Sequence, residues 1–367
     1  MKRMNSSRYF LRMVVVCGLS ATWLVGAGLG YLSEKANAVV VGSVASRVEG
    51  PSAVSFTINI SRVLSGNVPG PTASVVHSWA GLLRGSPRTI EQPLYGMWFL
   101  SGGGAEAWDV LTARPLGMRT VLGLFLPVSR GPLSGPYAYP AGTPFVDALV
   151  YEVAAGVQST GADPGILLGA LDSLDTPAVQ AVLKACIASG KPAFQAVGLA
   201  ASLDRQSPGA VQQLARLWSA ISNDPHREEV VAALRDSWRD PAPDAVRQLA
   251  ATAKAEPVGS DLFAAAVRAL AAIHTEESLP LLAELLHSAS REERTQAIYG
   301  LSSFANGCPM KTRSNVVSMA YLQCHEPSAY RTADTVANFS FRPGTQDQQA
   351  ALVSFWRDWW TAHPELH

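Results

Sequence analysis

The chain has 367 residues, of which 48% are hydrophobic and 16% are charged, so it can bury a substantial core and is not a disordered chain. Its 29 basic residues equal its 29 acidic residues in number. Five basic residues and one acidic residue lie within residues 1–38, which leaves 24 basic and 28 acidic residues, a net charge of −4, in the remainder. A mildly acidic chain is not expected to bind nucleic acid.

The N-terminus predicts export. Basic residues precede an apolar run over residues 13–32, and the sequence Ala36-Asn37-Ala38 follows it. This succession is typical of a secretory signal peptide, so we expect residues 1–38 to be removed and the mature protein to begin at Val39. Because the run is also long enough to span a bilayer, an uncleaved membrane anchor is the alternative. Either case places the chain from Val39 onward in the periplasm or outside the cell.

Residues 39–128 predict a β domain. Four apolar residues alternate with four polar ones over residues 54–61, and this period of two is that of a half-buried strand. Further strand-like runs are separated by Gly- and Pro-rich turns, and they lie at 39–48, 73–78, 95–100, 108–112 and 121–126. Five or six short strands with no helix between them predict a small antiparallel β-barrel or sandwich.

The order of three segments in this domain resembles the netrin-like β-barrels, which share the OB architecture. The segments are Val39-Val40-Val41-Gly42-Ser43-Val44, Arg62-Val63-Leu64-Ser65-Gly66 and Tyr95-Gly96-Met97-Trp98-Phe99-Leu100. The resemblance implies an OB-type barrel. Metalloprotease inhibitors of that family act through an N-terminal cysteine, and because residues 39–128 contain no cysteine, inhibition is not implied here.

Residues 129–143 are rich in Gly, Pro and Ser and predict a linker to a helical domain over residues 144–305. Apolar residues then recur at helical spacing, for example from Val179 and from Phe263. Several segments place a capping residue before a proline, as helix starts do. Helices are therefore expected to begin near residues 177, 192, 208, 225, 242, 260, 276 and 291.

A short pattern repeats through these helices. The pattern Ala-[Val/Ile]-x-x-[Leu/Val] begins at Ala178, Ala210, Ala245, Ala266 and Ala297. It is similar to HEAT repeats, which implies an α-α solenoid in which small alanines let paired helices pack closely. An irregular helical bundle is the alternative.

Residues 306–367 depart from the repeat and predict a loop followed by a capping helix. Cys308 and Cys324 bracket the loop and are expected to form a disulfide in an oxidising compartment, whereas Cys186 is expected to be a buried thiol. The alternative, a metal site built on Cys324-His325-Glu326, lacks a second ligand cluster.

Tryptophans gather in the C-terminal helix at Trp356, Trp359 and Trp360. Their helical spacing favours a helix that covers the last repeat, and an aromatic ligand-binding surface is the alternative.

Neither a catalytic motif nor a cofactor-binding or metal-binding motif is present in the sequence. We therefore expect no enzymatic activity, no cofactor and no metal. The sequence favours an exported interaction or scaffold protein that binds protein partners through its helical-repeat surface. The alternative is an envelope enzyme of unknown reaction, with a site between the domains or in residues 308–326.

Overall fold

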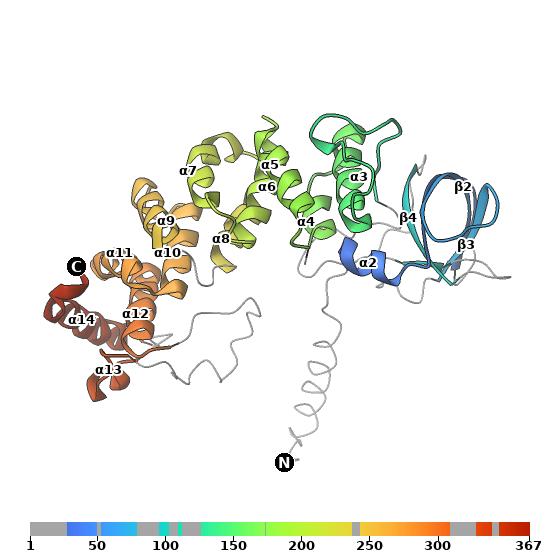
Figure 1. Ribbon diagram of the computed structural model, residues 1–367. Helices are drawn as coiled ribbons and strands as arrows, with labels where there is room; N and C mark the ends of the chain where they lie inside the picture. The colour runs from blue at the N-terminus through green and yellow to red at the C-terminus, as the bar shows by residue number, and fades with distance from the viewer. Residues whose placement is uncertain are drawn as a thin grey trace, which may run out of the picture. The chain divides into compact units, whose positions relative to one another are not determined.

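The computed structural model describes residues 28–49, 53–78, 95–102, 109–111, 126–172, 174–236, 243–308, 328–339 and 345–367 (Figure 1). The chain forms two compact units, an N-terminal unit (Met1–Ala185) and a C-terminal unit (Cys186–His367). The boundary between them falls inside α5 (Pro177–Ala188). The predicted linker, residues 129–143, does not divide the structure, because the N-terminal unit continues through it. That unit therefore combines the sheet with α3 (Phe145–Thr160) and α4 (Ile166–Ala170).

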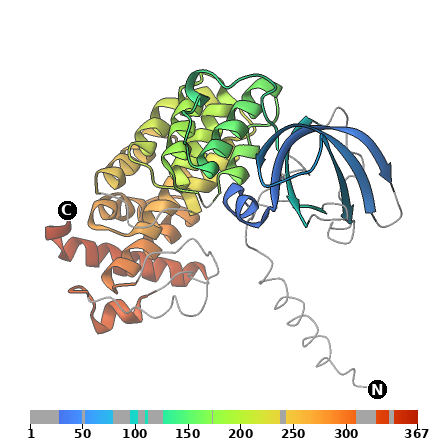
Figure 2. The same ribbon diagram turned by 45° about the vertical axis from the view of Figure 1, so that its right-hand side comes forward.

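An antiparallel sheet forms the first half of the N-terminal unit, in the strand order β3-β2-β1-β4-β5. Its strands are β1 (Ala38–Glu49), β2 (Ala53–Ser65), β3 (Thr72–Ser78), β4 (Tyr95–Ser101) and β5 (Asp109–Val110). The sheet is strongly curled (Figure 2), and Cα atoms of its edge strands β3 and β5 approach within 8 Å. No ladder joins these two edges in the described residues, so the sheet is open and the predicted closed barrel is not present.

The curl of the sheet follows from its pairing. The register between β1 and β2 shifts three times, which leaves Ala45 on β1 and Ser61 and Leu64 on β2 without opposite residues. Such bulges increase the local twist of a strand pair. One side of the sheet holds an apolar cluster around Phe56 and Trp98, whose ring centroids lie 6.0 Å apart.

The opposite side of the sheet is also buried near the start of β1. Val39, Val41 and Phe99 are at most 2% exposed there. Helix α2 (Leu29–Lys35) contacts both α3 and β4, so it belongs to this unit. The fold therefore begins before Val39, and Ala38 is the first residue of β1.

The C-terminal unit is helical. After α5 its helices are α6 (Pro192–Asp204), α7 (Ala210–Ile221), α8 (Arg227–Asp236), α9 (Pro243–Ala255), α10 (Asp261–Ile273), α11 (Leu279–Leu285), α12 (Arg291–Ala305), α13 (Ala333–Ala337) and α14 (Gln346–Ala362). Each predicted helix start from residue 177 to residue 291 is confirmed to within three residues. Of the capping residues before prolines, Thr176 acts as a cap, because its Oγ1 accepts a hydrogen bond from the Val179 amide at 3.4 Å. Two further helices begin with a serine cap that no proline follows: Ser260 Oγ accepts from the Phe263 amide, and Ser290 Oγ accepts from the Glu293 amide.

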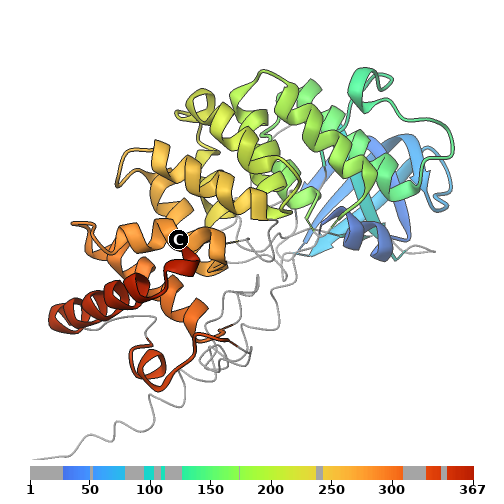
Figure 3. The same cartoon turned by 60° about the vertical axis from the view of Figure 1, so that its left-hand side comes forward.

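Two rows of helices can be followed through this unit (Figure 3). In what we call the even-numbered row, α6, α8, α10, α12 and α14 contact one another in succession. In the other row, α7 contacts α9, and α9 contacts the 3-10 turn η3 (Glu276–Ser278) that precedes α11. The packing is close: a Cβ added at Gly300 of α12 would lie 3.1 Å from the Ala271 Cα of α10. The small residues Gly300 and Ala271 allow these two helices to approach closely.

Candidate functional surfaces

Two of the three tryptophans singled out in the sequence are buried. Trp356 is 0% exposed and Trp359 is 7% exposed, whereas Trp360 is half-buried and stacks on His367 at 4.3 Å. The Trp356 Nε1 donates a hydrogen bond to the Asn338 carbonyl at 3.3 Å. An exposed aromatic surface built from all three rings is therefore wrong, because α14 turns two of them into the core.

Polar contacts fix α14 to its neighbours. The buried Gln349 side chain donates from Nε2 to the Arg291 carbonyl and to Thr295 Oγ1, both at 2.8 Å, and its Oε1 accepts from Arg294 at 3.1 Å. The Arg357 guanidinium donates to the carbonyl of Leu286, at the end of α11, at 2.7 Å. This helix covers the end of the even-numbered row, as a capping helix does.

Of the cysteines in the sequence predictions, the structure describes Cys186 and Cys308 but not Cys324. Cys186 is buried in α5 and Cys308 is 1% exposed beyond the end of α12. Cys324 lies outside the described residues, as do His325, Glu326 and all of the 308–326 segment except Cys308, so the disulfide and the metal alternative stay predictions. Within the described residues, no three His, Cys, Asp or Glu side chains gather closely enough to hold a metal ion.

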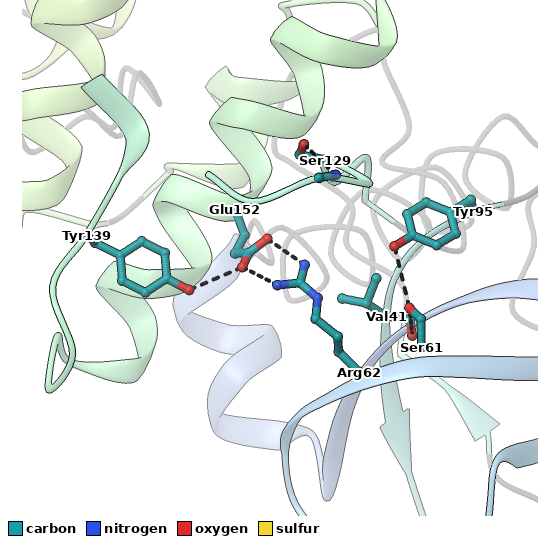
Figure 4. A network of polar contacts seen from close by, with 8 residues as sticks. Val41, Ser61, Arg62, Tyr95, Ser129, Tyr139 and Glu152 are labelled. Atoms are coloured by element: carbon teal, nitrogen blue, oxygen red, sulfur yellow. Dashed lines mark hydrogen bonds and ion pairs between the residues drawn. The ribbon is translucent and has the colours of Figure 1, made fainter. Parts of the chain in front are cut away.

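A partly buried ionic cluster joins the sheet to α3 (Figure 4). Glu152 of α3 has a side chain that is 2% exposed, and its two oxygens accept paired hydrogen bonds from Arg62 of β2, each at 2.9 Å. The Tyr139 hydroxyl donates to Glu152 Oε1 at 3.1 Å. The paired geometry is the strong form of an arginine–carboxylate contact.

The electrostatics of this cluster favour a structural role. The hydrogen bond to Glu152 raises the pKa of Arg62 above its ordinary value. Burial, and then the charge of Glu152, raise the pKa of Tyr139, so the hydroxyl stays protonated and keeps donating at neutral pH. Both carboxylate oxygens of Glu152 are already engaged, which leaves no obvious general base in the cluster. Sequence reasoning missed this pair; its one local signal was an acidic residue within the apolar stretch 148–157.

One face of the sheet offers an uncharged, exposed surface. The register sets Val48, Ser55 and Val76 in one row across β1, β2 and β3. Val48 is 67% exposed and Val76 is 39% exposed. Two further rows on this face carry hydroxyl and amide groups, and they are Ser46-Thr57-Ser74 and Ser43-Asn59-Thr72. The surface can form hydrogen bonds but presents no fixed charge.

The helical surface carries ion pairs between elements that are not adjacent in the chain. Each joins a basic residue to an acidic residue of a later element, and they are Arg227–Asp261, Arg268–Glu292, Lys254–Glu284 and Arg247–Glu277. The N···O distances lie between 2.9 and 3.7 Å. Because the charges neutralise one another within the chain, they leave little net field to attract a charged partner.

In the described residues, no helix combines the length and the apolar character needed to cross a membrane. No family model, no curated protein and no solved structure matches this chain.

Proposed function

We propose that this chain is an exported, non-enzymatic interaction protein that binds a protein partner through the exposed side of its even-numbered row. The observation that carries the proposal is the unbroken succession of contacts from α6 to α14. This succession supports an α-solenoid, an architecture whose repeats create one extended surface instead of a single pocket. The N-terminal sequence supports the exported location.

The even-numbered row is the side that we assign to binding. Helices that approach one another most continuously line the inner side of a curved stack, and this inner side is where such proteins bind partners. Ala264 and Arg268 of α10 are exposed on this row, and Arg268 is paired with Glu292 of α12. A small residue beside neutralised charges suits a partner that is recognised by shape and hydrogen bonding.

The test uses two matched substitutions. Ala264→Arg places a long side chain on α10, and Ala251→Arg places the same side chain on an exposed position of α9. Affinity capture from the envelope fraction should retain the same protein with wild type and with Ala251→Arg, and Ala264→Arg should reduce its recovery at least about tenfold, a loss of 1.4 kcal/mol or more. Equal recovery with both variants would exclude this surface, provided that both melt like wild type.

A further inference from the structure

The structure gives the segment before Val39 a place in the fold. Leu29 and Leu32 of α2 are 0% and 2% exposed, and α2 contacts α3 and β4. Both leucines lie inside the apolar run over residues 13–32 that the sequence assigned to a signal peptide or an anchor. They serve instead as core residues of the N-terminal unit.

The chain between α2 and β1 is equally well integrated. The Asn37 amide donates to the Leu100 carbonyl at 2.8 Å, and its side-chain oxygen accepts from the Gly102 amide at 2.9 Å. Ala38 is fully buried and pairs with Leu100. Gly66 packs so closely here that an added Cβ would lie 2.2 Å from the Asn37 carbonyl oxygen. Cleavage after Ala38 would remove a helix and part of a strand's hydrogen bonding.

We propose that the export signal is cleaved after Ala27, so that the mature protein begins at Gly28. The inference rests on the proposed export. Val25-Gly26-Ala27 ends in the small residue that a cleavage site needs, and the apolar run that precedes it, residues 13–24, has the length of a signal-peptide apolar region. Cleavage at this bond leaves α2 and Ala38 in place.

Gly28 packs closely against the backbone of residues 169–172. A Cβ at Gly28 would lie 2.7 Å from the Asp172 carbonyl oxygen, 3.1 Å from that of Gly169 and 3.3 Å from that of Ala170. A side chain has no room there, so the first residue of the proposed mature chain has to be glycine.

The packing of α2 into the N-terminal unit also disfavours an uncleaved membrane anchor. Once α2 is part of the folded unit, the apolar residues left for a bilayer are 13–28. Sixteen residues in a helix extend about 24 Å, less than the roughly 30 Å of a hydrocarbon core.

The first experiment reads the mature N-terminus. The full chain is produced in an exporting bacterium, and the exported form is analysed by intact mass and N-terminal sequencing. We expect Gly28 as the first residue. Ala27→Gln should block this processing and accumulate the precursor. The matched control, Ala36→Gln, alters the small residue that cleavage after Ala38 requires, and it should still begin at Gly28.

Other outcomes distinguish a wrong cleavage site from a failure of the proposed export. An exported wild-type chain that begins at Val39 or at Met1 overturns the cleavage site and leaves export standing. A chain that stays uncut in the cytoplasm overturns both.

A second measurement does not depend on export. Chains that begin at Gly28 and at Val39 are released from a removable tag and melted side by side. We expect the chain that begins at Val39 to melt at least about 10 °C lower or to lose its cooperative transition, because it lacks α2. Equal melts would overturn the inference.

Discussion

Glu152 is the most deeply buried charge described in the N-terminal unit, and its partners come from two other segments. A buried carboxylate is tolerated when it is paired and hydrogen-bonded, and Arg62 and Tyr139 satisfy both of its oxygens. The Arg62 side chain is 40% exposed, so solvent screens part of the attraction. The main effect of the cluster is therefore to fix α3 against β2.

Tyr139 makes this cluster sensitive to alkaline pH. Its pKa is raised above the ordinary value of 10, so its contribution to stability is complete below pH 10 and is lost as the pH rises through the folded-state pKa. Tyr139→Phe should destabilise the protein by about 1 kcal/mol at pH 7, because it removes one hydrogen bond. Urea unfolding at several pH values should show the difference between variant and wild type narrowing above pH 10. A difference that stays constant to high pH would contradict the contact.

Substitution of Trp356 tests whether α14 packs into the core. Trp356→Ala should cost about 3–5 kcal/mol of unfolding free energy, because it empties a fully buried site. Trp360→Ala, at a half-buried position of the same helix, serves as the control and should cost much less. Thermal melts of the two variants beside wild type measure the effect. An unshifted melt of Trp356→Ala would show that this ring is not part of the core.

At the scale of elements, α3 lies against the segment that leads out of the sheet. Met97 and Leu126 exchange backbone hydrogen bonds of 2.8 and 2.9 Å, and they hold this segment beside β4. Gly156 of α3 then meets Pro127, where an added Cβ would lie 2.2 Å from the carbonyl oxygen. The approach of helix to backbone depends on the missing side chain.

Gly156→Ala should therefore separate α3 from the sheet in spite of the higher helix propensity of alanine. We expect a loss of about 1–3 kcal/mol or more, as for an overpacked core. Gly131→Ala is the matched control, because an added Cβ there meets nothing within 4 Å, and it should leave stability within about 0.5 kcal/mol of wild type. Chemical denaturation measures both. A neutral Gly156→Ala would mean that α3 packs less closely than described.

The ion pairs between helices of the C-terminal unit make only a small contribution to stability. Exposed pairs such as Arg268–Glu292 contribute at most about 1 kcal/mol each. Each pair nevertheless links two elements that are not adjacent in the chain.

At the scale of the whole molecule, the C-terminal unit closes by folding its last segments back onto α12. The Asn306 side-chain Nδ2 donates to the carbonyls of Ser302 and Thr335 at 2.9 and 3.0 Å, and the Thr335 hydroxyl donates to Asn306 Oδ1 at 3.2 Å. This network ties α13 to the end of α12. Cys308 lies two residues beyond Asn306. The predicted Cys308–Cys324 disulfide would therefore begin next to this network.

The exported protein should contain this one disulfide, Cys308–Cys324, and one thiol, Cys186. Thiol titration in denaturant should find about one thiol per chain, and Cys186→Ala should remove it. Reduction should lower the unfolding free energy by about 3 kcal/mol, the value for a loop of roughly 15 residues. Three titratable thiols in the exported form would contradict the pairing.

The sequence alone determined the features that depend on neighbouring residues. Alternation over residues 54–61 identified β2, and capping residues before prolines placed the helix starts, because strand and helix signals act over a few residues. Tertiary structure decided the rest. The unit boundary, the place of α2 in the core, the burial of Trp356 and the pairing of Arg62 with Glu152 all depend on which distant surfaces meet. An apolar run such as 13–32 has the same local pattern whether it enters a membrane or packs against β4, and only the partner surface distinguishes the two.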